Sequence, residues 1–312
     1  MEGKIRGEKT LILMLLAQAA TYTNFADLGL VSAVYVPLPF TDWRLPLRFY
    51  SLAYIVGIFA GYWLVKKMLR QPGAPMAERH VDDLLFWAML GVILGGRLGY
   101  VLFYNLDRYL ADPAAIVRLW DGGMSFHGGV VGVTLAIWYI ARRNGLSFLR
   151  ICDYVACVVP IGMLLGRLAN FVNGELWGRE AYDVPWAMTF CDIATDPCVS
   201  SMIPRHPSQL YQAGLEGLFM LVLMTWLFWR TKARYNPGML VGIFAAGMGL
   251  SRFINEFFRE PDAQLLEFAQ RTGLSMGQWL TVPMILLGLW LAWSAKGRRQ
   301  RVEPFAGADS VA

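Results

Sequence analysis

Three arginines lie inside long apolar stretches of this sequence: Arg97 in GGRLGY, Arg167 in GRLANF and Arg252 in LSRFINEFF. A charge at the centre of a membrane helix costs on the order of 3 kcal/mol, so such residues are expected to face a polar cavity or a partner. Guanidinium groups bind phosphate through paired hydrogen bonds. The three arginines therefore indicate a site for an anionic phospholipid. The alternative is local pairing, of Arg252 with Glu256 and of Arg167 with Asn170.

The composition places these arginines in a membrane protein. The 312 residues are 56% hydrophobic and 16% charged, with a mean hydropathy of +0.42, which is too apolar for a soluble domain. The segments long enough to cross a bilayer core of roughly 30 Å begin near Leu47, Leu84, Met124, Ile151, Ser208, Gly238 and Met276. We therefore expect an all-α polytopic membrane protein with about seven transmembrane helices.

The Lys and Arg residues predict the orientation of these segments. They concentrate in the loops that follow the first, third, fifth and seventh segments, for example at Lys66, Arg142, Arg230 and Arg298. Loops rich in these residues stay in the cytoplasm, and so does the C-terminus. At 1.5 Å per residue, the three buried arginines then lie roughly 20 to 24 Å from the inner ends of their segments. They should share one depth in the outer half of the bilayer. The net charge of +5 is explained by these loops and requires no nucleic-acid partner.

A small head is expected outside the membrane between the fourth and fifth segments. It covers about residues 175–207, where YDVPWAMTF predicts a short strand-and-turn structure. Cys191 and Cys198 lie in it, and an oxidising exterior would permit a disulfide between them. Two free thiols are an equal alternative.

The two ends of the chain form separate regions. Residues 1–46 are an N-terminal arm whose MEGKIRGEKTLILMLLAQAA suits a secretory signal or an extra membrane segment. The transmembrane catalytic domain is expected over residues 47–295, and residues 296–312 form a cytoplasmic tail.

The histidines suggest proton transfer rather than metal binding. The four Cys and three His form no cluster with the spacing of a metal site, and we expect no metal. His127 follows MSF at the outer end of the third segment and could accept a proton, because free imidazole titrates at about pH 6.5. A structural role is the alternative. His206 in RHPSQLY suits a turn or a cap.

Several motifs together resemble the prolipoprotein diacylglyceryl transferase family of bacterial inner-membrane enzymes. They are GRLANFVNGELWGR, DGGMSFHGG, RHPSQLY, GGRLGYVLFYN, and FFREPDAQ with SMGQ. The resemblance implies transfer of a diacylglyceryl group from phosphatidylglycerol to the lipobox cysteine of a preprolipoprotein, which forms a thioether and releases glycerol phosphate. It implies no cofactor. The implied partners are phosphatidylglycerol, the signal peptides of preprolipoproteins and membrane lipids, and we expect a monomer.

The resemblance also assigns roles to particular residues. The catalytic residues it implies are His127, Arg167, Arg252 and Tyr50. The residues expected to bind phosphatidylglycerol, together with Arg97 from its depth, are Arg167, Asn170, Glu175, Gly178, Arg252 and Glu256. Arg167 and Arg252 would hold the phosphate and offset the charge on the leaving group. His127 would help to deprotonate the thiol, or else the arginines alone would lower the thiol pKa and His127 would only position the substrate.

Two other classes of protein are weaker alternatives. A lipid transporter or scramblase would also need a cationic groove that faces outward, but it would move phosphatidylglycerol without releasing glycerol phosphate. An intramembrane protease would need a nucleophile paired with a base, and the sequence has no HExxH motif.

Overall fold

The computed structural model describes residues 22–30, 33–37, 44–104, 106–191, 200–260 and 271–299. The signal-like run, Cys198 with the proposed disulfide, and residues 300–312 of the tail lie outside the described residues. The longer helices are α2 (Phe49–Leu69), α3 (Arg79–Tyr104), α5 (Phe126–Asn144), α6 (Phe148–Val172), α8 (Met220–Arg230), α9 (Met239–Asn255) and α11 (Met276–Ser294). Shorter helical segments are α4 (Leu106–Ala111), α7 (Ser208–Gln212) and the π-helical η4 (Ala213–Phe219).

The helices confirm a multi-pass membrane protein. By length and composition, five helical stretches of the described chain can cross a membrane. They are Phe49–Leu69, Arg79–Tyr104, Phe148–Val172, Ser208–Arg230 and Met276–Arg298. A helix also occupies each of the two remaining predicted segments, although α9 has only 17 residues. The number of crossings, predicted as about seven, stays a prediction.

Contacts divide the chain into two compact units. The first unit contains the described residues of 1–60, 159–226 and 242–290, and the second those of 61–158, 227–241 and 291–312. Tyr50, Arg167 and Arg252 belong to the first unit, whereas Arg97 and His127 belong to the second.

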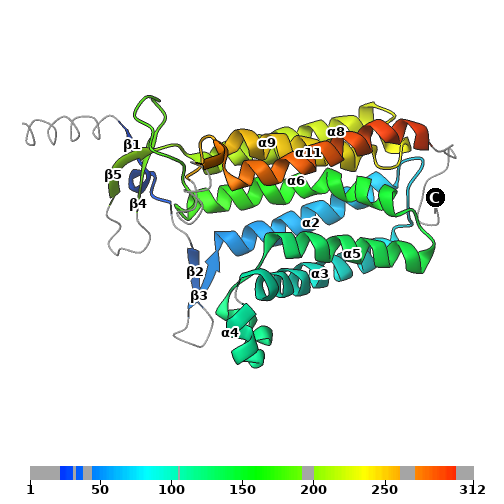
Figure 1. The fold of residues 1–312 in the computed structure, drawn as a ribbon, viewed down its shortest axis with the longest axis horizontal. Coiled ribbons are helices and arrows are strands. Elements are labelled where there is room, and N and C mark those ends of the chain that lie inside the picture. The colour runs from blue at the N-terminus through cyan, green and yellow to red at the C-terminus, as the bar shows by residue number, and fades with distance from the viewer. Residues whose placement is uncertain are drawn as a thin grey trace, which may run out of the picture. The chain divides into compact units, whose positions relative to one another are not determined.

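The second unit is organised by close packing of α3 against α5, which lie side by side (Figure 1). The contact is made through glycines. A Cβ atom at Gly91 would come 2.5 Å from the carbonyl oxygen of Gly132, and one at Gly99 would come 2.8 Å from the Cα of Gly128. Larger residues are therefore excluded at these positions, as expected for membrane helices whose backbones approach closely.

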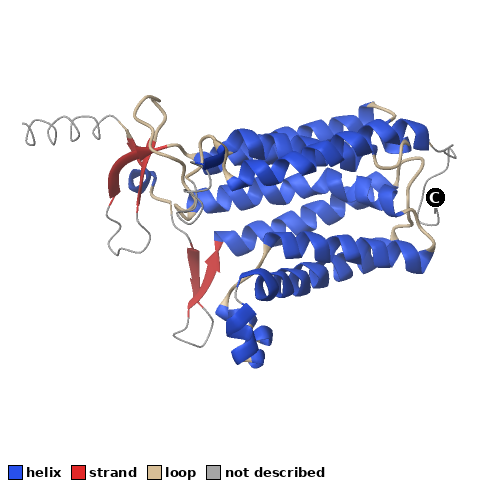
Figure 2. Ribbon diagram, viewed as in Figure 1, coloured by secondary structure: helices blue, strands red, loops and turns tan. Residues whose placement is uncertain are grey.

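The first unit carries a small three-stranded sheet (Figure 2). Its strands are β1 (Thr23–Asn24), β4 (Met188–Cys191) and β5 (Ser200–Arg205), in the order β1-β4-β5. Strand β4 is parallel to β1 and antiparallel to β5. The predicted strand-and-turn structure between the fourth and fifth segments is therefore present, joined by a strand from the N-terminal region. Its side of the membrane stays a prediction.

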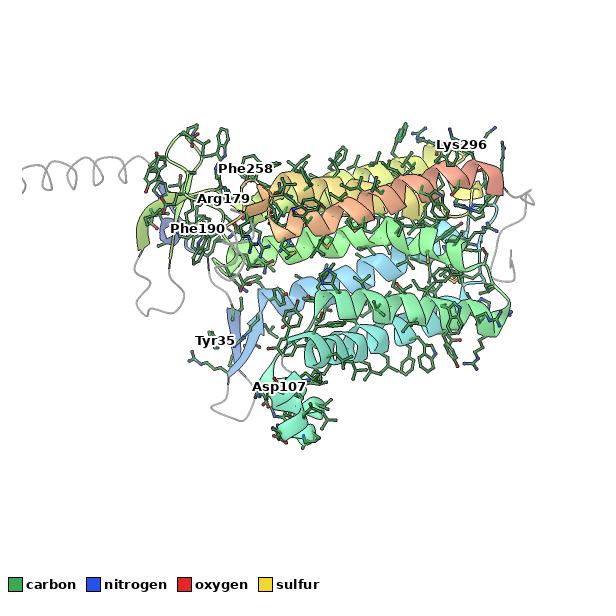
Figure 3. The ribbon with its side chains drawn as sticks, in the orientation of Figure 1. Tyr35, Asp107, Arg179, Phe190, Phe258 and Lys296 are labelled. Carbon is green, nitrogen blue, oxygen red and sulfur yellow. The ribbon has the colours of Figure 1, made fainter. Side chains whose placement is uncertain are left out.

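Aromatic residues attach this sheet to the end of α6. Phe25 and Phe190 are buried together with Met188, and Phe171 packs against them. The Phe25 and Phe171 rings meet edge to face, with centroids 5.6 Å apart, a favoured aromatic geometry. Figure 3 labels Phe190 at this sheet. A second, antiparallel pair of strands, β2 (Ala33–Pro37) and β3 (Arg44–Arg48), leads into α2.

Candidate active site

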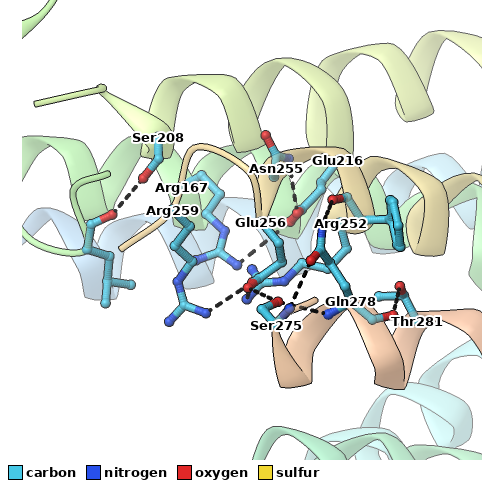
Figure 4. Close-up of polar contacts among 12 residues, drawn as sticks. Arg167, Ser208, Glu216, Arg252, Asn255, Glu256, Arg259, Ser275, Gln278 and Thr281 are labelled. Carbon is cyan, nitrogen blue, oxygen red and sulfur yellow. Dashed lines mark hydrogen bonds and ion pairs between the residues drawn. The ribbon is translucent and has the colours of Figure 1, made fainter. Parts of the chain in front are cut away.

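Three arginines and two glutamates of the first unit form one polar cluster (Figure 4). Arg167 comes from α6, Arg252 from α9, and Arg259 from the turn that follows α9. An ion pair joins Arg167 Nη2 to Glu216 Oε2 at 3.7 Å, and another joins Arg252 Nη2 to Glu256 Oε1 at 2.5 Å. The structure therefore brings together Arg167 and Arg252, which lie 85 positions apart in the sequence numbering.

Glu256 connects several parts of this cluster. One of its oxygens contacts both Arg252 and, at 3.3 Å, Arg259, while the other accepts a hydrogen bond of 2.9 Å from the Ser275 hydroxyl. Gly277 leaves the space that this carboxylate needs, because a Cβ atom there would lie 2.7 Å from Glu256 Cδ. The local pair of Arg252 with Glu256 is thus confirmed, but it is one contact in a larger network.

Ser275 has a structural position in this network. It stands in GLSMG, which has the G-x-S-x-G spacing of some hydrolase nucleophiles. Its hydroxyl donates to Glu256 and accepts from the backbone N–H of Gln278 at 3.1 Å, at the start of α11. These contacts are those of a helix cap rather than of a nucleophile hydrogen-bonded to a base.

Glu216 is the residue that the sequence-based reasoning missed. The alternative of local pairing considered Glu256 as the partner of Arg252 and Asn170 as the partner of Arg167. Instead Arg167 pairs with Glu216, whose side chain is only 1% exposed. A glutamate in the middle of the apolar stretch AGLEGLF is itself a signal of function, because ionisable residues are rare in membrane helices.

The guanidinium groups of the cluster are more exposed than its carboxylates. Arg167 and Arg252 are 21% and 23% exposed, whereas Glu216 and Glu256 are almost fully buried. Within the described residues, Glu216 at 3.7 Å is the only polar partner of Arg167. Arg167 therefore keeps donors for a further anion.

The signature motif after Arg167 forms an ordered turn at the end of α6. Asn170 and Asn173 both donate their side-chain amides to one carboxylate oxygen of Glu175, at 2.9 and 3.1 Å. The backbone N–H of Glu175 returns a bond to the carbonyl of Asn170, and Gln209 donates to the carbonyl of Glu175 at 2.6 Å. These bonds order the turn that follows α6.

Gly178 allows two backbone segments to meet. Its N–H donates to the carbonyl of His206 at 2.8 Å, and a Cβ atom at this position would come 2.8 Å from the His206 Cβ. The next residue, Arg179, donates through its backbone N–H to Phe258 and through its side chain to the carbonyl of Arg259, both at 2.9 Å. Figure 3 labels Arg179 and Phe258. Gly178 is therefore required for this close approach, and its binding of phosphatidylglycerol stays a prediction.

His206 has the turn position expected from RHPSQLY. It precedes α7, and its Nδ1 lies 3.1 Å from the hydroxyl of Tyr211. Burial lowers the pKa of the imidazole below its usual value, partly opposed by the charge of Asp183. His206 is therefore neutral at physiological pH.

Tyr50 belongs to the same unit as the arginine cluster. It stands at the start of α2, and its hydroxyl lies 3.3 Å from that of Tyr54. Its side chain is 38% exposed, so that a ligand can reach it.

Arg97 was expected to bind the donor lipid, but its side chain contacts the protein backbone. Among the residues that the structure describes, its guanidinium donates only to backbone carbonyls of the second unit. Nε donates to Ile116 at 2.9 Å, Nη1 to Gly122 and Gly123, and Nη2 to Ala115 and Arg118. A guanidinium has five N–H groups, and each has a carbonyl partner here. Arg97 is 3% exposed. These contacts favour a structural role over the binding of a lipid phosphate.

His127 lies in the first turn of α5. Ser125 caps this helix by accepting a hydrogen bond of 3.2 Å from the N–H of Gly128. The imidazole is exposed, contacts the ring of Phe126, and makes no hydrogen bond to any described residue. Both ring nitrogens are thus available to a substrate. Among the described residues, no group of three or more His, Cys, Asp or Glu side chains could hold a metal ion.

The apolar helices and the cationic cluster define a polytopic membrane protein with a polar site suited to an anion. The family model for prolipoprotein diacylglyceryl transferase matches residues 37–294. Similar proteins are named phosphatidylglycerol–prolipoprotein diacylglyceryl transferase. One from Erythrobacter litoralis is 57% identical over 83% of this chain and 89% of its own length, and one from Zymomonas mobilis is 52% identical over 81% and 85%. The chain belongs to the prolipoprotein diacylglyceryl transferase family.

Proposed function

We propose that this protein transfers the diacylglyceryl group of phosphatidylglycerol to the cysteine thiol of prolipoproteins, the first step of lipoprotein maturation. The observation that carries the proposal is the cluster of Arg167, Arg252 and Arg259 in a chain of this family. The guanidinium groups of Arg167 and Arg252 are partly exposed, and Arg167 keeps donors beyond its 3.7 Å contact with Glu216. The negative oxygens of a phosphodiester would accept from these donors.

Arg167 and Arg252 hold the phosphate of the lipid. Arg252 is oriented by its 2.5 Å contact with Glu256, and Arg167 is turned toward Glu216 without a short hydrogen bond. Fixed guanidinium groups stabilise the charge that develops on a phosphate leaving group, because they need no reorientation during the reaction. The ordered turn around Glu175 holds the last part of α6 and hence Arg167 in place.

The reaction exchanges one bond at the glycerol backbone of the lipid. The cysteine sulfur, as thiolate, forms a bond to the glycerol carbon that carries the phosphate ester. The bond from that carbon to oxygen breaks, and glycerol phosphate leaves with the bonding electrons. The thiol proton is accepted by His127, whose imidazole has no other described partner, or is lost to solvent if the arginines alone lower the thiol pKa.

The family implies the setting of this reaction, which is the bacterial inner membrane. The C-terminus lies in the cytoplasm in this proposal, because Lys and Arg concentrate in the loops assigned to that side. Both the lipid and the signal peptide reach the site from the bilayer. The protein acts as a monomer.

The test uses purified full-length protein, phosphatidylglycerol vesicles and a lipobox peptide. We expect lipidated peptide and glycerol phosphate in equal amounts. The Arg167→Gln and Arg252→Gln variants should lower kcat/KM by about 100-fold or more, the size expected for loss of one charge-stabilising donor. The control is Arg142→Gln. Arg142 is exposed and lies in the last turn of α5, at the end of the helix opposite to His127, and its replacement should leave the rate unchanged. Lipid movement without release of glycerol phosphate would instead identify a transporter.

The role of His127 needs a separate measurement. His127→Gln keeps a hydrogen-bonding side chain but cannot take up a proton. If His127 is the base, the variant loses the rise in rate with pH that the wild-type protein shows as imidazole deprotonates. An unchanged pH profile would reject the base and leave a positioning role.

A further inference from the structure

Three buried side-chain oxygens of the first unit have no hydrogen-bond donor. They are Oε1 of Gln209, Oε1 of Gln212 and Oδ1 of Asn255, and no described residue donates to any of them. Each of these residues is 1% exposed. Buried oxygens without a donor are uncommon and costly in proteins, so each needs an explanation. These three oxygens are among only five buried side-chain atoms without a hydrogen-bond partner in the described residues.

Asn255 contacts the arginine cluster directly. It donates its amide to Glu216 Oε1 at 3.3 Å, and Glu216 is the ion-pair partner of Arg167 (Figure 4). Gln212 lies four positions before Glu216 in the same helical stretch, which places both side chains on one face. The carboxylate of Glu216 therefore lies between Asn255 and a guanidinium that keeps free donors.

The backbone holds this arrangement in place. Glu216 lies in the π-helical segment η4, and such interruptions of an α-helix occur frequently at functional sites. The following residue, Gly217, presses against α6, because a Cβ atom there would come 2.6 Å from the Cα of Leu164. Leu164 lies one turn before Arg167 on α6. The close contact at Gly217 thereby fixes Glu216 opposite Arg167.

The arginines and the unpaired oxygens place two different requirements on a ligand. The arginines attract an anion, and the unpaired oxygens of Gln212 and Asn255 require hydrogen-bond donors. A cationic headgroup could donate, but it would add a positive charge beside three guanidinium groups. A phosphate that carries a neutral headgroup with hydroxyl groups meets both requirements, because the phosphate is the anion and the hydroxyl groups are the donors. The glycerol headgroup of phosphatidylglycerol has two hydroxyl groups.

We propose that Gln212 and Asn255 form a headgroup subsite that accepts hydrogen bonds from the glycerol hydroxyls of the donor lipid and so selects it. The inference rests on the proposed function, because it concerns the same lipid at the same cluster. It makes Gln212 and Asn255 specificity-determining residues. Glu216 is a positioning residue that connects the Asn255 amide to Arg167.

The test compares two donor lipids with the full-length protein and a lipobox peptide. The first is phosphatidylglycerol, and the second is phosphatidylpropanol, which has the same phosphate but no free hydroxyl. The wild-type protein should prefer phosphatidylglycerol in kcat/KM by about 100-fold or more, because sites built to bind a hydroxyl reject ligands that lack it. Gln212→Met, which keeps the side-chain length, should reduce this preference about tenfold, mainly through a lower rate with phosphatidylglycerol. Asn255→Leu should act in the same direction.

The control is Gln278→Met, in α11. Gln278 is also buried, but its oxygen accepts from Ser275 and its amide donates to Phe253. This variant should lower the rates with both lipids by the same factor. Equal rates of the wild-type protein with the two lipids would overturn the proposed subsite, even if no variant folds. An unchanged preference for phosphatidylglycerol in Gln212→Met would also overturn it. Failure of the wild-type protein to lipidate the peptide from phosphatidylglycerol would reject the proposed function instead.

Discussion

Replacing Arg97 should destabilise the second unit strongly, because one side chain supports a whole loop. In Arg97→Met, five backbone carbonyls of residues 115–123 lose their guanidinium donor. Hydrogen bonds to charged groups contribute about 1.5–3 kcal/mol each, but the carbonyls of the exposed part of this loop can regain water. We therefore expect a loss of about 3–5 kcal/mol, similar to that of breaking a buried ion pair.

The measurement is thermal unfolding in detergent, together with hydrogen exchange of the loop. A loss of this size should lower Tm by on the order of 10 °C. Exchange should increase in residues 112–125, since the same loop contains Ser125, whose N–H donates to the carbonyl of Gly96 at 2.8 Å. Arg97→Lys keeps the charge but has only three donors, and it should give an intermediate Tm.

A matched control tests the reasoning. Arg108 is an exposed arginine on α4, close to the ring of Tyr109 at 5.8 Å. Arg108→Met should change stability by less than about 0.5 kcal/mol. If Arg97→Met unfolds within about 2 °C of the wild-type protein and shows unchanged exchange, the carbonyl contacts do not stabilise the loop and the structural assignment of Arg97 is wrong.

Three further predictions concern other positions. Gly132→Ala should cost about 1–3 kcal/mol because its Cβ would overlap the carbonyl oxygen of Gly91, whereas Gly162→Ala, with no atom within 4 Å, should leave Tm unchanged or raise it. Gly178→Ala should reduce lipidation about tenfold or more with unchanged helical content by circular dichroism, because the new methyl group displaces neighbouring backbone. Burial lowers the pKa of His206 in the folded protein. The unfolded state therefore binds more protons than the folded state, and the stability of the fold should decrease as the pH falls below about 6.5. His206→Gln should make Tm less sensitive to pH between 7.5 and 5.5, and an equal fall in both proteins would contradict this.

The sequence by itself determined what depends on neighbours along the chain. Apolar length predicted the membrane helices. The pair of Arg252 with Glu256 followed from their separation of four residues, which places them on one helical face. The motifs around Arg167 and His127 indicated the family, which was confirmed.

Only the tertiary structure decided which partner each buried charge has. Arg167 and Glu216 are 49 positions apart, and no periodicity of either helix indicates that they meet. Arg97 resembled the other two arginines in sequence, yet the carbonyls of a distant loop take up its donors. A buried ionisable residue requires a partner, and this requirement can be read from the sequence. The identity of the partner depends on how helices pack and where a π-helical turn directs a side chain, which is a property of the folded chain.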